Sequence, residues 1–207
     1  TIGSTARNAG YVSGTGTSAL VFRYTVQAGE TDSDGIAISS PLALNSGTIK
    51  DLAGNDAGLT FTLPNTTGVL VDTTAPSISS VTPPANGTYR AAQNLDFTVN
   101  LSENVAVTGT PRLSLTIGTA SRNADYQSGS GTSALLFRYT VQGGDTDTDG
   151  IASASPLALN SGTIKDGAGT DAGLTFTAPT TSGVLVDTTA PSVASVTGPS
   201  NGTYRAN

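Results

Sequence analysis

The sequence contains no cysteine, histidine, methionine or tryptophan, and only 12% of its 207 residues are charged. Without cysteine and histidine it lacks the usual nitrogen and sulfur ligands of zinc, a cysteine nucleophile and the base of a Ser-His-Asp triad. Helix-forming runs of Leu, Glu and Lys are almost missing as well. The abundant Thr, Ser, Val and Gly favour strands and turns instead.

Basic residues are few and scattered. Nine Lys and Arg stand against fifteen Asp and Glu, a net charge of −6, so a nucleic-acid partner is not expected. No apolar run approaches the length of a membrane span, so we expect no membrane insertion in this fragment. No signal peptide begins the chain, but the chain starts inside a repeat, so this says nothing about secretion.

The chain repeats itself over most of its length. Residues 1–92 align with residues 116–207 without a gap at a constant offset of 115, and about three quarters of the positions are identical. Residues 93–115 occur once. A period near 115 residues is too long for a propeller blade or a solenoid coil. It suits one β-sandwich domain of roughly 100 residues.

The repeat boundary is predicted at VDTTAPS, which occurs at 71–77 and again at 186–192. There the strand-like GVLV runs into a Thr-rich stretch that ends in proline, which donates no ladder hydrogen bond and stiffens a link. We therefore predict three parts. Residues 1–74 are the C-terminal part of an upstream module, 75–189 a complete module, and 190–207 the start of a third.

Alternating apolar and polar residues predict strands throughout the module. The inward faces are Leu95, Phe97, Val99 and Leu101 in LDFTVNL, Leu113, Leu115 and Ile117 in LSLTI, and Leu135, Phe137, Tyr139 and Val141 in LLFRYTV. LTF and GVLV supply the last strands, and SVTPPANGTY supplies the first, with NG as a turn signal. About seven short strands and no helical period predict an all-β fold of immunoglobulin-like β-sandwich modules in tandem.

Three motifs connect this pattern to a known family. VDTTAP, SENVAVTGTPRLSLTIG and SGTIKDGAGTDA, in this order and in near-identical copies, resemble the bacterial Ig-like repeats of large surface adhesins of the biofilm-associated (Bap-like) and RTX types. The resemblance covers essentially the whole chain. It implies a secreted stalk at the bacterial cell surface, with binding domains elsewhere. It also implies calcium at or near the junctions of some relatives.

The stretch DTDTDG, residues 145–150, matches positions 1, 3, 5 and 6 of an EF-hand calcium loop. Pro156 stands at position 12, where that loop has its bidentate glutamate, so a complete EF-hand is excluded. A simpler calcium site, completed by an acid from a neighbouring loop, and a solvent-exposed turn both stay open. The candidate calcium ligands are Asp145, Asp147 and Asp149, with Glu30, Asp32 and Asp34 in the other copy.

Further acidic residues have the same two interpretations. Asp166 and Asp171 lie in KDGAGTDA, a composition that also suits a tight turn between strands, and we favour the turn. Asp72 and Asp187 stand just before the predicted links. They either help to hold a junction ion or cap free backbone amides, and we favour the cap.

Three classes of function are compatible with these repeats. We favour a structural stalk, in which identical neighbouring modules extend a distal binding domain in adhesion and biofilm formation. The alternative is a ligand-binding adhesive module for carbohydrate or matrix protein. Arg23 and Arg138, on the outward face of FRYTV, are then ligand contacts rather than surface arginines. An enzyme is disfavoured, because the acids lie in repeated turns and not singly on a cleft.

The predicted boundary has a consequence for this fragment. Residues 1–74 lack the first two strands of their own module, and residues 75–115 can complete either the segment before them or the segment after them. An open sandwich exposes strand edges and core. We therefore predict that the fragment leaves one half module open or swaps strands between chains, so that it associates with itself.

Overall fold

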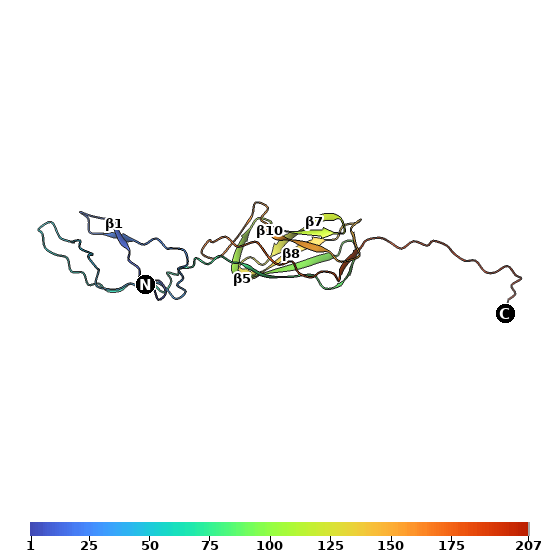
Figure 1. The fold of residues 1–207 in the computed structure, drawn as a ribbon, viewed down its shortest axis with the longest axis horizontal. Helices are drawn as coiled ribbons and strands as arrows, with labels where there is room; N and C mark the ends of the chain where they lie inside the picture. The colour runs from blue at the N-terminus through green and yellow to red at the C-terminus, as the bar shows by residue number, and fades with distance from the viewer. Residues whose placement is uncertain (207) are drawn as a thin grey trace.

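The computed structural model describes residues 1–206 and contains strands, bridges and turns, with no helix in that range (Figure 1). The all-β class predicted from the sequence is confirmed. The described residues include no helix long and apolar enough to cross a membrane.

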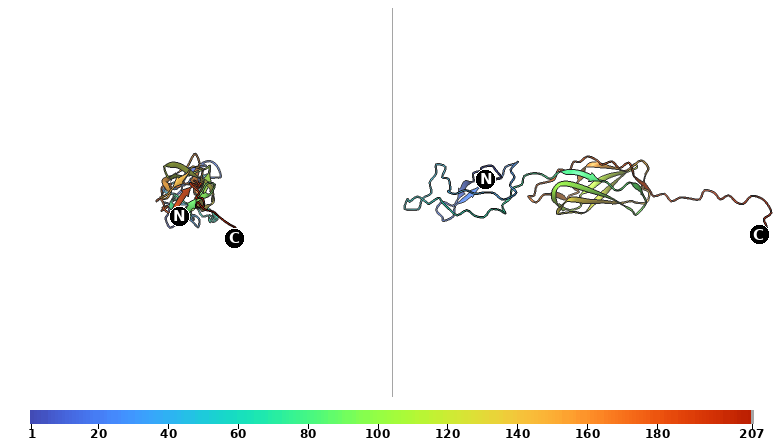
Figure 2. Two further views of the ribbon diagram at one scale, coloured as in Figure 1. Left: turned by 90° about the vertical axis from the view of Figure 1, so that its right-hand side faces the viewer. Right: turned by 90° about the horizontal axis from the view of Figure 1, so that it is seen from below.

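Three parts follow one another along the long axis of the molecule (Figures 1 and 2). Residues 1–74, here the N-terminal region, form open loops with one hairpin. Residues 75–189, the central region, carry ten strands and most of the core. Residues 190–206, the C-terminal tail, extend away from the central region at the end opposite the N-terminal region.

The central region is built from two sheets. The larger has seven strands in the order β10-β6-β7-β8-β5-β11, with β3 pairing with β5 outside this path. These strands are β3 (Ile78–Thr82), β5 (Asn94–Thr108), β6 (Arg112–Ile117), β7 (Ala120–Ser128), β8 (Thr132–Thr140), β10 (Ala152–Ala158) and β11 (Thr163–Lys165). The smaller sheet has the order β4-β12-β9, with β4 (Gly87–Tyr89), β9 (Thr146–Asp147) and β12 (Val184–Asp187).

The long strand β5 makes the larger sheet curl. Its first half pairs with β3 and β8, and its second half pairs with β11. The register against β8 shifts between Asn100 and Val105, which marks the change of partner. Only β4 and β12 form a parallel strand pair in the described residues, and every other strand pair is antiparallel.

Both sheets contribute to one core. The predicted inward faces of the three alternating segments are all buried, so this prediction is confirmed. Val184 and Val186 of β12 join the same cluster from the smaller sheet. Outward-facing Arg138 and Asp96 are register partners on β8 and β5, and their side chains pair there. Alternation therefore predicted the core face correctly wherever one face of a strand is apolar.

The number and extent of the strands differ from the expectation. The central region has ten strands rather than about seven. LTF, residues 174–176, is not a strand, although Leu174 and Phe176 pack against the core. The polar strand β7 was not predicted, because ASRNADYQS lacks an apolar face. Edge strand β10 contains Pro156, which has no amide to donate, and its register against β6 breaks between Ala154 and Ala158.

The N-terminal region has the same sequence pattern but few strands. It contains only β1 (Gly10–Ser13) and β2 (Val21–Arg23), which pair with each other. Counterparts of core residues are exposed here: Phe22 is 37% exposed, whereas Phe137 is fully buried. The prediction of an open half is consistent with this exposure.

Candidate functional site

The link between the N-terminal and central regions is held in place by backbone hydrogen bonds. The Gly173 amide donates to the Pro76 carbonyl over 2.8 Å, and Pro76 is buried. Ser77 and Ser102 bond each other twice: the Ser102 amide donates to the Ser77 carbonyl, and the Ser77 amide donates to Ser102 Oγ over 3.0 Å. These bonds place the preceding Asp72 beside the end of the central region.

Three carboxylates meet at this link. Asp72 comes from the N-terminal region, Glu103 from β5 and Asp166 from the turn that follows β11. One oxygen of each lies within 4.8 Å of the other two. Strand β11 pairs with β5, which brings Asp166 toward Glu103. We call these three residues the junction cluster.

Asp166 is the buried member of the junction cluster, with 5% of the residue exposed. Its Oδ1 accepts a hydrogen bond from the Thr170 amide over 2.8 Å. Its Oδ2 is buried and accepts no hydrogen bond. Burial raises the pKa of Asp166, but hydrogen bonds led by Thr170 outweigh it and hold the pKa below its usual value. The residue is therefore an anion with one unpartnered oxygen, which favours a cation beside it.

The raised pKa of Glu103 reflects both its burial and the repulsion among the carboxylates of the cluster. Burial raises the pKa of Glu103, and the negative charges of Asp72 and Asp166 raise it further. None of the ion pairs in the described residues includes a member of the cluster. Oxygens that share one Ca²⁺ lie at most about 5 Å apart, because each Ca–O bond is about 2.4 Å. The spacing of the junction cluster fits that limit.

Asp72 has a second contact that the sequence predicted. Its Oδ1 accepts a hydrogen bond from the Thr74 amide over 2.9 Å. Asp187, one period later, accepts the equivalent bond from the Thr189 amide over 2.8 Å. Both residues thus cap amides, as favoured above, and Asp72 in addition belongs to the junction cluster.

The corresponding turn in the N-terminal region provides a comparison with the turn of Asp166. Asp51 is the counterpart of Asp166, and it is exposed. Its Oδ1 accepts bonds from the Ala53 and Asn55 amides, and its Oδ2 accepts one from Asn55 Nδ2 over 2.9 Å. Both oxygens of Asp51 thus accept hydrogen bonds from residues at most four positions away. This copy is therefore a polar turn with its carboxylate satisfied locally.

The DTDTDG stretch has a different arrangement, beginning with Asp145. Asp145 is 1% exposed and accepts hydrogen bonds from the Arg122 guanidinium, the Tyr139 hydroxyl and the Gln142 amide. Burial raises the pKa of Asp145, but the bonds from Tyr139, Gln142 and Arg122 outweigh it and leave the pKa below its usual value. Both of its oxygens are therefore already paired.

Asp147 closes the same loop. Its Oδ2 accepts from the Gly118 amide over 2.6 Å and its Oδ1 from the Gly150 amide over 2.7 Å. Gly150 has a φ of 108°, and an added Cβ there would collide with the backbone of Thr181 and Ser182. The glycine is needed by the loop itself. Asp149 is exposed.

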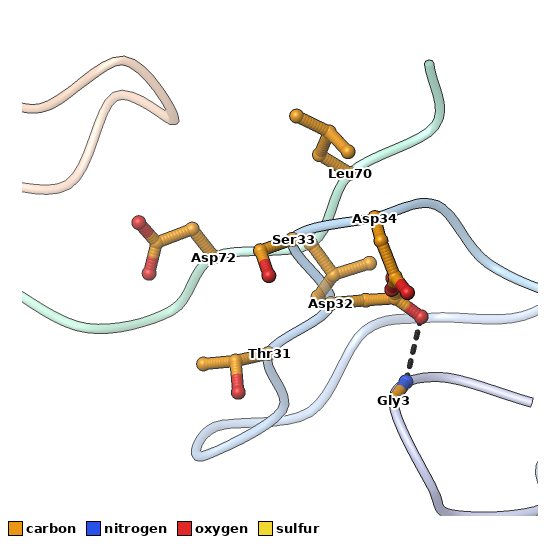
Figure 3. A pocket seen from close by; sticks show the side chains of 8 residues that line it. Gly3, Thr31, Asp32, Ser33, Asp34, Leu70 and Asp72 are labelled. Atoms are coloured by element: carbon orange, nitrogen blue, oxygen red, sulfur yellow. Dashed lines mark hydrogen bonds between the residues drawn. The ribbon is translucent and has the colours of Figure 1, made fainter. Parts of the chain in front are cut away.

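The first copy has the same contacts around ETDSDG. Glu30 accepts from the Gln27 amide, the Tyr24 hydroxyl and the Arg7 guanidinium, and these bonds lower its pKa to about 2. Asp32 and Asp34 line a pocket of about 410 Å³ (Figure 3). The Gly3 amide donates to Asp32 there, over 2.6 Å.

The predicted calcium loops and the junction cluster thus differ in what their oxygens already bind. In the two loops, four acids, namely Asp145, Asp147, Glu30 and Asp32, accept hydrogen bonds within the fold. The junction cluster has an unpartnered buried oxygen instead. Calcium at the loops stays a prediction, and the junction cluster is the stronger candidate. Sequence reasoning missed Glu103, although SENV contained the only acid in the unrepeated segment besides Asp96.

The chain matches no known family model, no curated protein and no solved structure. The function is therefore inferred from the repeat, the fold and the junction cluster.

Proposed function

We propose that the chain is a piece of a stalk of tandem immunoglobulin-like β-sandwich modules, exported to a bacterial cell surface, whose junctions bind calcium. The observation that carries this proposal is the junction cluster. It draws Asp72 from one side of the link and Glu103 and Asp166 from the other, and it leaves a buried oxygen without a donor.

The geometry explains how an ion would act. Asp72 precedes the link, while Glu103 and Asp166 belong to the central region. A cation bound by all three carboxylates would join the two sides of the link and offset their repulsion. Such a link is stiff where calcium is plentiful and looser where it is scarce. This behaviour suits a stalk that must extend outside the cell.

Two features of the chain support the stalk. The near-identical copies at an offset of 115 residues provide length by repetition. The three parts follow one another along one axis, so that further copies would lengthen the molecule (Figures 1 and 2). The resemblance to repeats of large surface adhesins points to the same function and to adhesion and biofilm formation as its setting.

Calcium titration by calorimetry tests the proposal, because the number of ions distinguishes the sites. The described residues contain one junction cluster, whereas the acidic loop occurs at 30–35 and at 145–150. We expect the titration to give one ion per chain. In a thermal melt, calcium should raise the melting temperature by several degrees relative to the chelator-treated chain. Two ions per chain would assign calcium to the loops, and no binding would remove calcium from the proposal.

A matched pair of variants locates the ion. Asp166→Asn removes a charge from the junction cluster, and Asp51→Asn makes the same change at the exposed counterpart. We expect Asp166→Asn to weaken calcium binding at least about tenfold and Asp51→Asn to leave it unchanged. Equal effects would show that the cluster does not hold the ion.

A further inference from the structure

The outward face of the larger sheet carries its charges on a single row. Across β6, β7, β8 and β5 in turn, successive register partners are Arg112, Asp125, Arg138 and Asp96. We call these four residues the charged row. The other outward residues of β6, β7, β8 and the first half of β5 are uncharged. The row therefore alternates plus, minus, plus and minus across about 14 Å, at about 4.8 Å per strand.

Ion pairs within the sheet use only part of the bonding capacity of the charged row. Arg112 Nε donates to Asp125 Oδ1 over 2.7 Å, and Arg138 donates to both oxygens of Asp96 over 2.6 and 2.7 Å. The four side chains are between 37% and 48% exposed. No hydrogen bond in the described residues uses Asp125 Oδ2 or Arg138 Nη1. The two central members of the row thus retain an acceptor and a donor for a partner.

This face lies along the side of the molecule. The N-terminal region and the C-terminal tail meet the central region at its two ends, and the strands of the larger sheet run roughly along the long axis (Figures 1 and 2). Further repeats at either end would therefore leave the charged row uncovered. The exposure of the row thus belongs to the central region itself and does not depend on the extent of the chain on either side.

The charged row is complementary to itself in one orientation. Two such faces can be related by a twofold axis that runs along the strands, between β7 and β8. Each residue then meets the one equally far beyond the axis, so that Asp125 faces Arg138. By the same rule Arg112 faces Asp96. A twofold axis along the row would instead place every residue opposite its own copy, so that like charges meet. The first arrangement points the two chains in the same direction, and the second points them in opposite directions.

We propose that the charged row is a contact surface for a second copy of this chain, which lies alongside the first and points in the same direction. The partner is a second copy because the alternating row matches itself, whereas a purely acidic or purely basic partner would meet two like charges. The contact is polar and partly exposed, so it is weak and weakens with salt. It requires neither calcium nor the proposed function. If that function holds, the shared direction is that of neighbouring stalks on one cell.

Charge reversal tests the contact, because it leaves the open N-terminal region as a shared background. Self-association is measured by sedimentation velocity with chelator present, which separates the result from the calcium proposal. We expect Arg138→Glu to weaken self-association at least about tenfold. Arg23→Glu is the matched control, because Arg23 is the counterpart of Arg138 but Gly10 stands at the counterpart position of Asp125. Equal effects of the two variants, or an unaltered chain that is monomeric at every concentration, would overturn the proposal.

A mixture of two variants tests the facing pairs. Asp125→Lys alone should weaken self-association as Arg138→Glu does, because each variant places two like-charge pairs in the contact. An equimolar mixture of the two variants restores opposite charges at every facing position, so association should return to the level of the unaltered chain. Restored association also shows that both variants are folded. Two folded variants, verified by circular dichroism, that fail to associate when mixed would overturn the proposed pairing.

Cross-linking tests the direction, since the natural chain has no cysteine. Leu136 and Thr140 lie on β8 on either side of Arg138, each about 7 Å from it along the strand. In the proposed pair each lies nearest its own copy, whereas in a pair of opposite direction Leu136 lies nearest Thr140. A short bismaleimide should therefore join two Leu136→Cys chains at least about fivefold faster than a Leu136→Cys chain and a Thr140→Cys chain. The reverse preference would overturn the proposed direction.

A glycan array tests carbohydrate as the other occupant of this face. We expect the unaltered chain and the Arg138→Glu chain to show the same retention on the array. Retention of the unaltered chain that Arg138→Glu abolishes, together with a monomer at every concentration, would assign the face to carbohydrate and overturn the proposal.

Discussion

The N-terminal and central regions share a sequence but not a structure. Leu20 is 37% exposed and Val26 is 45% exposed, while their counterparts Leu135 and Val141 are 0% and 1% exposed. Most strand residues are identical in the two copies. What differs is residues 93–115, which occur once and form β5 and part of β6 in the central region. An apolar strand face therefore becomes a core only when strands from elsewhere cover it.

The local hydrogen bonds, by contrast, survive in both regions. The Tyr24 hydroxyl bonds Glu30 as the Tyr139 hydroxyl bonds Asp145, each over 2.6 Å. The loop cap at Asp32 likewise repeats the cap at Asp147. Short-range polar contacts thus follow from local sequence, while core formation depends on the long-range pairing of β5. Matched substitutions in the two copies make this difference measurable.

The largest difference is expected at the core phenylalanines. Phe137→Ala removes a fully buried ring that packs against Tyr126, and it should destabilise the central region by about 3–5 kcal/mol. Phe22→Ala makes the same change where the ring is 37% exposed, and it should leave the unfolding transition of the central region unchanged. Urea unfolding followed by circular dichroism measures both. A comparable loss in the two variants would mean that the copies pack alike in solution.

The next difference concerns the ion pair of buried Asp145 with partly exposed Arg122. Asp145→Asn removes the charge that the guanidinium contacts and should destabilise the central region by about 2–3 kcal/mol. Glu30→Gln, at the equivalent position, should not alter the unfolding transition of the central region. Thermal unfolding at neutral pH compares them, and an unaffected Asp145→Asn chain would contradict the structural role given to this contact.

Acid unfolding provides a second test of the contribution of Asp145 to stability. The folded-state pKa of Asp145 lies below the ordinary value of an aspartic acid. Its ionised form therefore stabilises the fold above that value, and this stabilisation is lost as the pH falls through the lower folded pKa. We expect the unaltered chain to lose more stability in this pH range than the Asp145→Asn chain. Parallel acid unfolding curves would show that another group dominates.

The smallest difference is expected at the outward arginines. Arg138 makes two bonds to Asp96, of 2.6 and 2.7 Å, between side chains that are 37% and 41% exposed. Arg138→Ala should cost no more than about 1 kcal/mol, and less at high salt. Arg23→Ala is the control, because no ion pair in the described residues includes Arg23. Chemical unfolding at two salt concentrations separates the variants, and a salt-independent loss would point to packing rather than charge.

The sequence predicted what depends on local pattern. Alternation located the buried faces of β5, β6 and β8. The sequence pattern did not predict β7, because β7 is a strand through its pairing with β6 and β8 and not through its composition. The spacing of its aspartates made DTDTDG a candidate calcium loop. The spacing could not show that Asp145 pairs with Arg122, which lies 23 residues away in the sequence. The junction cluster depends on the pairing of β5 with β11, so no local motif could show that Glu103 joins it.

The parallel pairing of β4 with β12 has a mechanical consequence. The chain enters the central region at one end, and β12 leads out at the other (Figure 1). Tension along the molecule therefore pulls β4 back toward its entrance and β12 toward its exit. In two parallel strands pulled in this way, the hydrogen bonds are loaded side by side in shear and must break together. A pull across the pair would open them one after another, so the topology resists force in the direction in which a stretched chain would apply it.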